Sequence, residues 1–148
     1  MLDISATSLE KAKERLGPRA KRVHWIAGDV MSVDLAAGHY DLWHDRAVFH
    51  FLTDLADRTA YARAASRAVR NGGFLIAATF APEAPALCSG LPVERYGPER
   101  LEQQFSGFSL IESRREEHQT PSGAMQPFTY ILMTRVASNA NRSAPLKP

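Results

Sequence analysis

The order of apolar segments in this sequence predicts an α/β domain, in which helices are layered on a sheet. Short apolar runs alternate with segments of helical periodicity in the order strand, helix, strand, strand, helix, strand. One run, residues 74–80, is almost uniformly apolar, as is typical of a strand covered on both faces. With 148 residues, 45% hydrophobic and 23% charged, the chain has the size of one globular domain with a core.

The N-terminal part predicts two short strands with a helix between them. Residues 2–5 have the composition of the end of a strand. Thr7 and Glu10 stand at capping-box spacing, ahead of apolar residues that recur on one helical face as far as residue 16. Residues 23–27 are apolar and rich in β-formers, so we expect a buried strand there, closed by a turn.

The middle of the chain predicts a strand, a helix and a second strand. The strand covers residues 40–43, and apolar positions recur at helical spacing over residues 57–70. Asn71-Gly72-Gly73 tolerates positive φ, and we expect this segment to end the helix. The apolar run 74–80 then follows as the second strand.

The C-terminal part predicts an irregular segment followed by two strands. Residues 81–97 contain several Pro and Gly residues, which favours an irregular excursion over one face of the sheet. A short helix is expected over residues 98–105, where Pro98 suits the first helical position. Residues 108–112 and 128–133 favour an antiparallel strand pair, because they are close in sequence. The Ser/Asn/Pro-rich tail 137–148 is expected to be disordered.

Composition argues against several classes of protein. A net charge of +2, with scattered basic residues, does not indicate binding to nucleic acid. The single cysteine, Cys88, and five histidines without ligand spacing predict neither a disulfide nor a structural metal site. No apolar stretch approaches the ~20 residues that cross a bilayer, and the N-terminus has no signal-peptide pattern, so we expect no membrane and a cytoplasmic location.

Five segments in this order resemble the class I S-adenosylmethionine-dependent methyltransferases. They are Leu2-Asp3-Ile4-Ser5, Gly28-Asp29-Val30, residues 40–51, residues 68–76, and the closing strand pair. The resemblance covers residues 1–136. It implies a Rossmann-like sheet with a C-terminal antiparallel strand pair, S-adenosylmethionine as the cofactor, and methyl transfer to a small-molecule acceptor.

The resemblance also implies roles for four residues at the nucleoside end of the cofactor. Asp3 would accept hydrogen bonds from the two ribose hydroxyls, and Ile4 would pack against the adenine ring. Asp29 would accept one from the adenine amine, with the backbone amide of Val30 beside it. Taken alone, each aspartate is also a common turn former or helix cap.

The segment after residue 43 is implied to line the methyl-transfer end of the site. Asp45 and Arg46 would lie beneath the methionine part of the cofactor. His44 and His50 are candidate bases because imidazole titrates near neutrality, and Asp45 could orient one of them. The alternative is that these polar groups only cap the strand and the helix.

The family pattern begins with a strand and a Gly-x-Gly-x-Gly loop that have no counterpart in this sequence. The second family strand is also reduced here to residues 1–3, so two almost empty positions would leave a gap of roughly 14 Å between the third and the fourth family strands. We expect a truncated or mis-started gene product; the alternatives are collapse into a smaller sheet, or a strand supplied by a partner or a second copy. We also expect the isolated chain to bind S-adenosylmethionine only weakly.

Two other functions remain open at this stage. A non-catalytic binding or interaction module could keep the Rossmann-like scaffold without turnover. A dinucleotide-dependent oxidoreductase is disfavoured, because the Gly28-Asp29 segment and the segment after residue 43 match the methyltransferase pattern.

Overall fold

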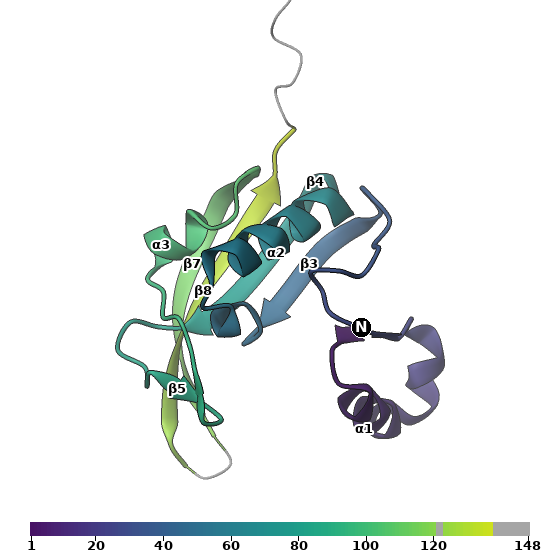
Figure 1. Cartoon of the computed structure of the whole chain (residues 1–148), viewed down its shortest axis with the longest axis horizontal. Coiled ribbons are helices and arrows are strands. Elements are labelled where there is room, and N and C mark those ends of the chain that lie inside the picture. Colours follow the sequence, from purple (N-terminus) through teal and green to yellow (C-terminus); the bar gives the residue numbers. More distant parts are fainter. Residues whose placement is uncertain (121–122, 138–148) are drawn as a thin grey trace, which may run out of the picture. The chain divides into compact units, whose positions relative to one another are not determined.

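A computed structural model describes residues 1–120 and 123–137 of the chain, which form two compact units divided after Leu35 (Figure 1). The units are described separately below. The predicted disordered tail lies outside the described residues except for Ala137.

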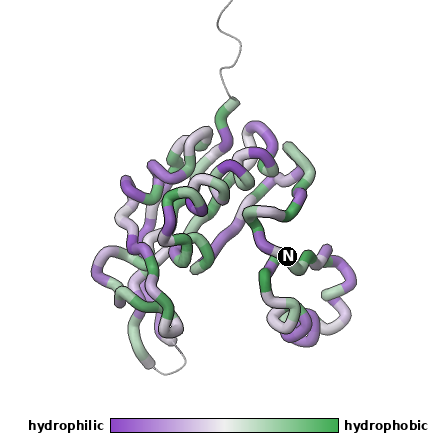
Figure 2. The backbone as a smooth tube through the Cα atoms, in the orientation of Figure 1, coloured by the Kyte–Doolittle hydropathy of each residue, from purple (hydrophilic) through white to green (hydrophobic). Residues whose placement is uncertain are grey.

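The first unit contains a two-stranded parallel sheet and two helical segments. Its elements are β1 (Leu2–Asp3), α1 (Ala6–Leu16), the 3-10 helix η1 (Gly17–Arg22) and β2 (Ile26–Ala27). In the register of the sheet, Leu2 pairs with Ile26 and Asp3 with Ala27. Helix α1 is largely hydrophilic, and Leu9 is its one buried residue (Figure 2). Because β2 contains only Ile26 and Ala27, the predicted strand over 23–27 is confirmed only in its last two residues.

The N-terminal cap of α1 is Ser5, so the predicted capping box at Thr7 is wrong. The backbone of Ser5 is extended, and its hydroxyl accepts a hydrogen bond from the amide of Ser8 at 3.2 Å. Ser5 follows directly after the end of β1, so the helix begins earlier than the Thr7–Glu10 spacing indicated. Gly17, with φ of 53°, ends the helix.

The second unit is built on a four-stranded mixed sheet in the order β3-β4-β8-β7. Strand β3 (Tyr40–Arg46) runs parallel to β4 (Val69–Phe80), whereas β8 (Met125–Arg135) is antiparallel to β4 and to β7 (Phe108–Gln119). The remaining elements are η2 (Phe49–Phe51), α2 (Leu55–Ala68), β5 (Leu87–Cys88), β6 (Leu91–Pro92) and α3 (Pro98–Glu102).

Helices α2 and α3 lie on one face of this sheet (Figure 1). Residues that alternate along β4 and β8 and point to this face are buried, among them Leu75, Ala77, Ile131 and Met133. The other face is open only in part: Ile76, Tyr130 and Leu132 are half-buried. Further along the same strands, this face is covered, and its buried residues form a second cluster, Ala78, Phe80, Ala84, Val93 and Phe128. Together with the β3–β4 pairing, this layering confirms the predicted α/β class.

The prediction that Asn71-Gly72-Gly73 ends the helix is wrong, because this segment lies within β4. Helix α2 stops at Ala68, and β4 starts at once with Val69 paired to Tyr40. The next pair is Leu42 with Phe74, so the residues between Val69 and Phe74 form an irregularity in the strand. Gly72, with φ of +72°, provides the positive φ at this irregularity.

The C-terminal elements agree with the prediction in type and differ in length. The two last strands pair antiparallel, as expected, but reach from Phe108 to Gln119 and from Met125 to Arg135. The excursion over 81–97 includes the small β5–β6 hairpin, and α3 ends at Glu102 rather than near residue 105.

The strands of the two units belong to separate sheets. In the described part of the chain, β3 pairs only with β4 and leaves its other edge unpaired, and β1 pairs only with β2. This break falls at the position predicted for the absent strand. Apart from the β5–β6 hairpin, the described strands thus form one sheet of two strands and one of four.

Candidate functional site

Asp3 and Asp29 lie at the same edge of the β1–β2 sheet. The two strands are parallel, Asp3 is the last residue of β1, and Asp29 follows the end of β2 by two residues. The amide of Gly28 donates to the carbonyl of Asp3 at 3.0 Å, which extends the pairing up to the residue before Asp29. The parallel pairing therefore brings together the two carboxylates that the sequence assigned to one nucleoside.

Each of these carboxylates makes one hydrogen bond to a nearby backbone amide. Asp3 Oδ1 accepts from the amide of Ser5 at 2.8 Å, and Asp29 Oδ1 accepts from the amide of Met31 at 2.9 Å. These are Asx-turn contacts, so both aspartates do form turns. Within the described residues, Oδ2 of each has no hydrogen bond, and both side chains are half-buried, which leaves an acceptor for a hydroxyl or an amine.

The two neighbours of these aspartates differ in exposure. Ile4 is 78% exposed, so an apolar side chain stands open beside Asp3. Val30 is half-buried in the turn that Asp29 begins. An exposed apolar side chain next to a carboxylate suits a ligand with a flat ring attached to a sugar.

Asp45 closes the turn that follows β3. Its carboxylate accepts hydrogen bonds from the amides of Val48 and Phe49, both at 3.0 Å, and from the hydroxyl of Tyr61 at 2.6 Å. The side chain is buried, and this burial raises the pKa of Asp45, although the three hydrogen bonds act in the opposite direction. Ala47 adopts φ of 63° within this turn. Asp45 thus holds a tight, strained connection in place.

In the described part of the chain, Asp45 accepts no hydrogen bond from a histidine, because amides and Tyr61 occupy its oxygens. His44 and Arg46 flank it on β3, and both are exposed. Arg46 Nε donates to the hydroxyl of Tyr130 at 3.0 Å, and its guanidinium lies 4.8 Å from the centre of the Phe128 ring.

His50 is fully buried among aromatic rings. Its Nδ1 accepts a hydrogen bond from the amide of Phe80 at 3.3 Å, so the ring proton of the neutral form lies on Nε2. Nε2 has no partner within the described residues. Burial lowers the pKa of His50 to about 4. In this state His50 can donate a hydrogen bond at neutral pH, and its acceptor nitrogen is already occupied.

Tyr61 is a member of the Asp45 network, although it lies among the apolar positions of the helix predicted over residues 57–70. Its hydroxyl donates to Asp45 and accepts from Trp43 Nε1 at 2.9 Å. Burial is the main cause that raises the pKa of Tyr61 well above its ordinary value. The one sequence signal for this role is a hydroxyl on an otherwise apolar helix face.

The predicted site residues fall into both units. Asp3, Ile4, Asp29 and Val30 lie in the first, whereas His44, Asp45, Arg46 and His50 lie in the second. Across residues 1–120 and 123–137, no group of three or more His, Cys, Asp or Glu side chains could hold a metal ion. No helix in this part of the chain combines the length and apolar character needed to cross a membrane.

Comparison with known proteins gives matches of two kinds. A family model described as a methyltransferase domain matches residues 1–77, just over half of the chain. Among solved structures, the chain resembles an S-adenosylmethionine-dependent methyltransferase from Methanosarcina mazei with a TM-score of 0.73 at 12% identity, over 91% of this chain and 80% of that one. No curated protein matches.

Two further solved structures have similar scores. One is 1,6-didemethyltoxoflavin-N1-methyltransferase from Burkholderia thailandensis, with bound S-adenosylhomocysteine: TM-score 0.70, 15% identity, 92% of this chain and 60% of that one. The other is the N-methyltransferase NodS from Bradyrhizobium japonicum: TM-score 0.68, 16% identity, 92% of this chain and 72% of that one. The chain thus spans 60 to 80% of the length of these three structures.

Proposed function

This chain belongs to the methyltransferase domain family, whose cofactor is S-adenosylmethionine, and on that premise we propose that it takes part in methyl transfer to a small-molecule acceptor. The observation that carries the proposal is the parallel β1–β2 pairing, which brings Asp3 and Asp29 to one edge. This arrangement suits a nucleoside, since one carboxylate can bind a ribose diol and the other an exocyclic amine.

The residues present fit the nucleoside part of the cofactor. Asp3 and Asp29 each keep an oxygen without a partner in the described structure, and Ile4 offers an exposed apolar surface for a ring. When bound, S-adenosylmethionine supplies an electrophilic methyl group. The protein's contribution is to hold the acceptor close and in line, which accounts for much of the rate in such displacements.

For the second unit we propose that His44, rather than His50, removes a proton where the acceptor arrives protonated. His44 is exposed at the end of β3, whereas the Nδ1 of His50 already accepts a hydrogen bond and its pKa is far below neutrality. His50 is better suited to donate a hydrogen bond from Nε2. Asp45 acts as a positioning residue, since it holds the turn that carries Phe49 and His50.

The proposal of a small-molecule acceptor is supported by the relatives in fold. One of them is named as a 1,6-didemethyltoxoflavin-N1-methyltransferase and holds 1,6-didemethyltoxoflavin, and another is an N-methyltransferase. Cytoplasmic location remains our prediction from composition.

A titration of the 148-residue chain with S-adenosylhomocysteine, monitored by backbone amide NMR, tests the cofactor proposal. We expect saturable shifts around Asp3, Ile4 and Asp29, with weak affinity. D3N and D29N should each weaken binding by roughly tenfold, because each removes a charged acceptor. E14Q is the matched control, because it neutralises an exposed carboxylate in α1, and it should bind like the wild type.

Two results would count against parts of this proposal. An absence of shifts in residues 1–35 at millimolar ligand would overturn the assignment of the nucleoside site. Micromolar affinity by calorimetry would instead contradict our expectation that the missing glycine loop costs most of the binding.

A second candidate function is a binding module without turnover. The break between the two sheets favours it, because the strands of the two units share no hydrogen bonds in the described structure. Incubation with methyl-labelled S-adenosylmethionine and a small-metabolite extract separates the two: transfer of label supports the enzyme, and cofactor binding without transfer supports the module.

A further inference from the structure

The four-stranded sheet of the second unit ends in two edge strands, β3 and β7, which differ in their protection. Strand β7 has a register irregularity between Leu110 and Glu112, and residues 112–118 after it are mostly charged. Irregularities and charged side chains keep the edges of natural sheets from pairing with another chain. In the β3–β4 pair, by contrast, the irregularity lies on β4, between Val69 and Phe74. The backbone of β3 itself is therefore regular along its free edge.

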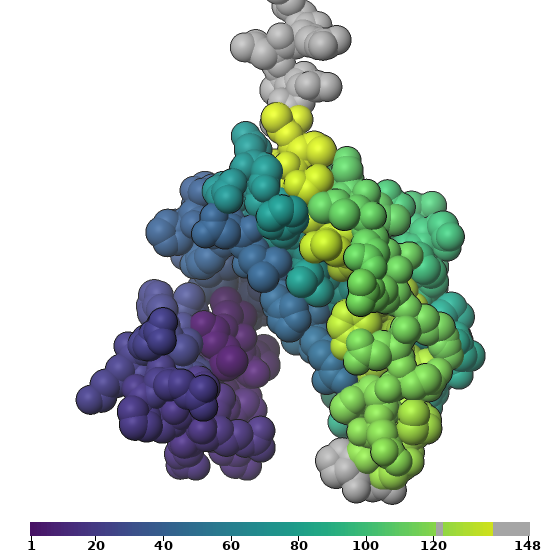
Figure 3. Space-filling view, turned by 180° about the vertical axis from the view of Figure 1, so that it is seen from behind, coloured from purple at the N-terminus to yellow at the C-terminus, as the bar shows by residue number. Residues whose placement is uncertain are grey.

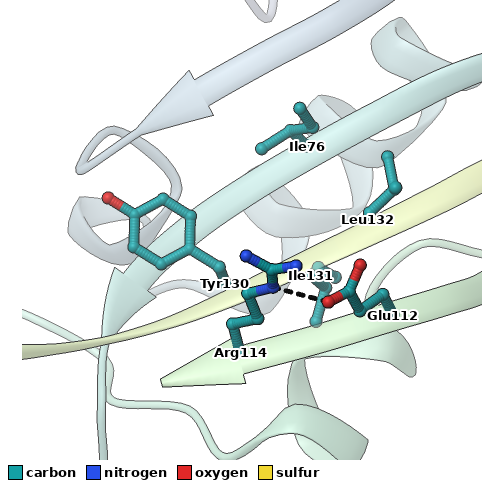
Figure 4. Close-up of a pocket in the computed structure, with 6 residues that line it drawn as sticks. All are labelled: Ile76, Glu112, Arg114, Tyr130, Ile131 and Leu132. Atoms are coloured by element: carbon teal, nitrogen blue, oxygen red, sulfur yellow. Dashed lines mark hydrogen bonds and ion pairs between the residues drawn. The ribbon is translucent and has the colours of Figure 1, made fainter. Parts of the chain in front are cut away.

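The three charged side chains of β3 are all held away from this free edge. Asp41 pairs with Arg70 of β4 at 2.6 Å, and Arg46 Nε donates to the hydroxyl of Tyr130 on β8 at 3.0 Å. Figure 4 shows the Tyr130 side chain reaching from β8 over β4. Asp45 is buried and accepts hydrogen bonds from the turn after β3. Charge therefore does not screen the free edge of β3.

The backbone groups of alternate residues in β3 point to the free edge. The amide of Ala47 donates to the carbonyl of Ala78 at 2.9 Å, and a Cβ atom at Gly73 would meet the Asp41 carbonyl oxygen at 2.9 Å. The odd-numbered residues of β3 thus face β4. Alternation along the strand directs outward the N–H and C=O groups of the even-numbered residues, Tyr40, Leu42, His44 and Arg46. Figure 3 shows β3 at the surface of the second unit, where another strand could add to the sheet.

The sequence of β3 complements itself when two copies run antiparallel with Leu42 opposite Leu42. In this register Asp41 lies opposite Trp43 of the second copy, so like charges do not meet. A shift of two residues in either direction would place Asp41 opposite Asp41 or Asp45 of the second copy. Leu42 is 48% exposed, and the pairing would bring its two copies into contact. Charge and apolar contact therefore favour the same register.

We propose that two copies of the chain pair through the free edges of β3, antiparallel about Leu42, so that their four-stranded sheets form one continuous sheet. Twofold symmetry repeats every backbone hydrogen bond and leaves no further β3 edge open. The self-complementary charge pattern selects a second copy over an unrelated chain. This inference concerns assembly through the second unit and is independent of the proposed methyl transfer.

Sedimentation equilibrium of the 148-residue chain tests the proposal. We expect a weak dimer with a dissociation constant on the order of 100 μM, because pairing of two short strands buries a small interface. L42K should raise this constant roughly tenfold or more, since it places two like charges opposite each other at the centre of the pair. A wild-type chain that stays monomeric up to about 1 mM would overturn the proposal.

F74K is the matched control for L42K. Phe74 is the register partner of Leu42, lies on the same face of the sheet and is 42% exposed, but it belongs to β4 rather than to the edge. We expect F74K to dimerise like the wild type. Loss of the dimer in both variants would assign the contact to the sheet face, and loss in neither would assign it elsewhere, so both results would overturn the proposed pairing.

A disulfide tests the register without adding charge to the edge. With Cys88 replaced in the C88S background, L42C should form an intermolecular disulfide on mild oxidation. Directly opposite residues that exchange backbone hydrogen bonds have Cα atoms about 5.5 Å apart, which is within the range of a disulfide. F74C in the same background should stay uncrosslinked. Absence of the crosslink in L42C, or equal crosslinking of both variants, would refute the register about Leu42.

Discussion

Asp45 and His50 are five residues apart, buried, and shifted in pKa in directions that both favour the neutral form. Burial raises the pKa of Asp45 and lowers that of His50 to about 4. Asp45 lies near the end of β3 and His50 in η2, and the resemblance implied roles in the chemistry for both. Their contacts show a second role, since Asp45 holds the turn and His50 accepts from Phe80 across to β4.

His50 makes stability depend on acidity between pH 6.5 and about 4. In this range the unfolded chain binds a proton that the folded chain does not, so stability is fully present above pH 6.5 and falls as the pH drops toward 4. The full shift corresponds to roughly 3 kcal/mol. H50N should remove this part of the pH dependence in urea unfolding followed from pH 7 to pH 4.

His24 provides the control for this experiment, because its side chain is exposed. H24N should keep the wild-type slope. If H50N also keeps it, another group causes the acid sensitivity.

Y61F should destabilise the protein by about 1–3 kcal/mol, since the change removes the acceptor of Trp43 Nε1 and one of the three hydrogen bonds to the buried Asp45 carboxylate. Loss of this hydrogen bond should raise the pKa of Asp45 further. A raised carboxyl pKa reduces stability as the pH rises through it, so the deficit should be larger at pH 7 than at pH 4. Urea unfolding at both pH values measures this difference.

Y40F is the matched control, because Tyr40 is only half-buried and its hydroxyl has no recorded hydrogen bond in the described structure. A pH-independent deficit in Y61F would show that its hydroxyl does not act on Asp45.

At the scale of elements, the start of β4 shows how a segment rich in glycine can be misassigned to the end of the preceding helix. Asn71-Gly72-Gly73 has the composition of a helix end, but the helix already stops at Ala68. Gly73 lies against Asp41 of the neighbouring strand, where a Cβ atom would be 2.9 Å from the Asp41 carbonyl oxygen and 2.8 Å from Val69 Cγ1. The glycine is therefore required by a close approach of two strands.

G73A should destabilise the second unit by about 1–3 kcal/mol through this overlap. G97A is the control, since a Cβ atom there would have ordinary contacts at 3.8 Å or more and φ is −78°. Thermal unfolding of both variants measures the difference. Equal melting temperatures would show that the strand pair adjusts without cost.

Strand β7 was predicted too short because its second half is charged. Residues 113–119 contain few apolar side chains, so no alternation of apolar and polar residues indicates a strand there. Pairing with β8 extends the strand to Gln119 regardless of this composition. Backbone hydrogen bonds supplied by a neighbour can thus form a strand that the local sequence does not predict.

At the scale of the whole molecule, the division into two units predicts unequal stability. The four-stranded sheet has a buried core of large side chains, whereas β1 and β2 have two residues each and α1 buries only Leu9. Amide hydrogen exchange should therefore be slowest in β4 and β8 and much faster in β1 and β2. S-adenosylhomocysteine should slow exchange in β1 and β2 if they carry the nucleoside site. Uniform exchange rates along the chain would contradict this division.

The sequence by itself determined the α/β class, the type of nearly every element, and the family, because these depend on local patterns of apolar residues and short motifs. The resemblance also assigned Asp3 and Asp29 to one nucleoside, and the parallel β1–β2 pairing brings both to one edge. Tertiary structure decided where β4 begins, how far β7 extends, and how Asp45 and His50 are used. These features depend on groups distant in sequence, such as Tyr61, Asp41 and Phe80, whose approach only the folded chain defines.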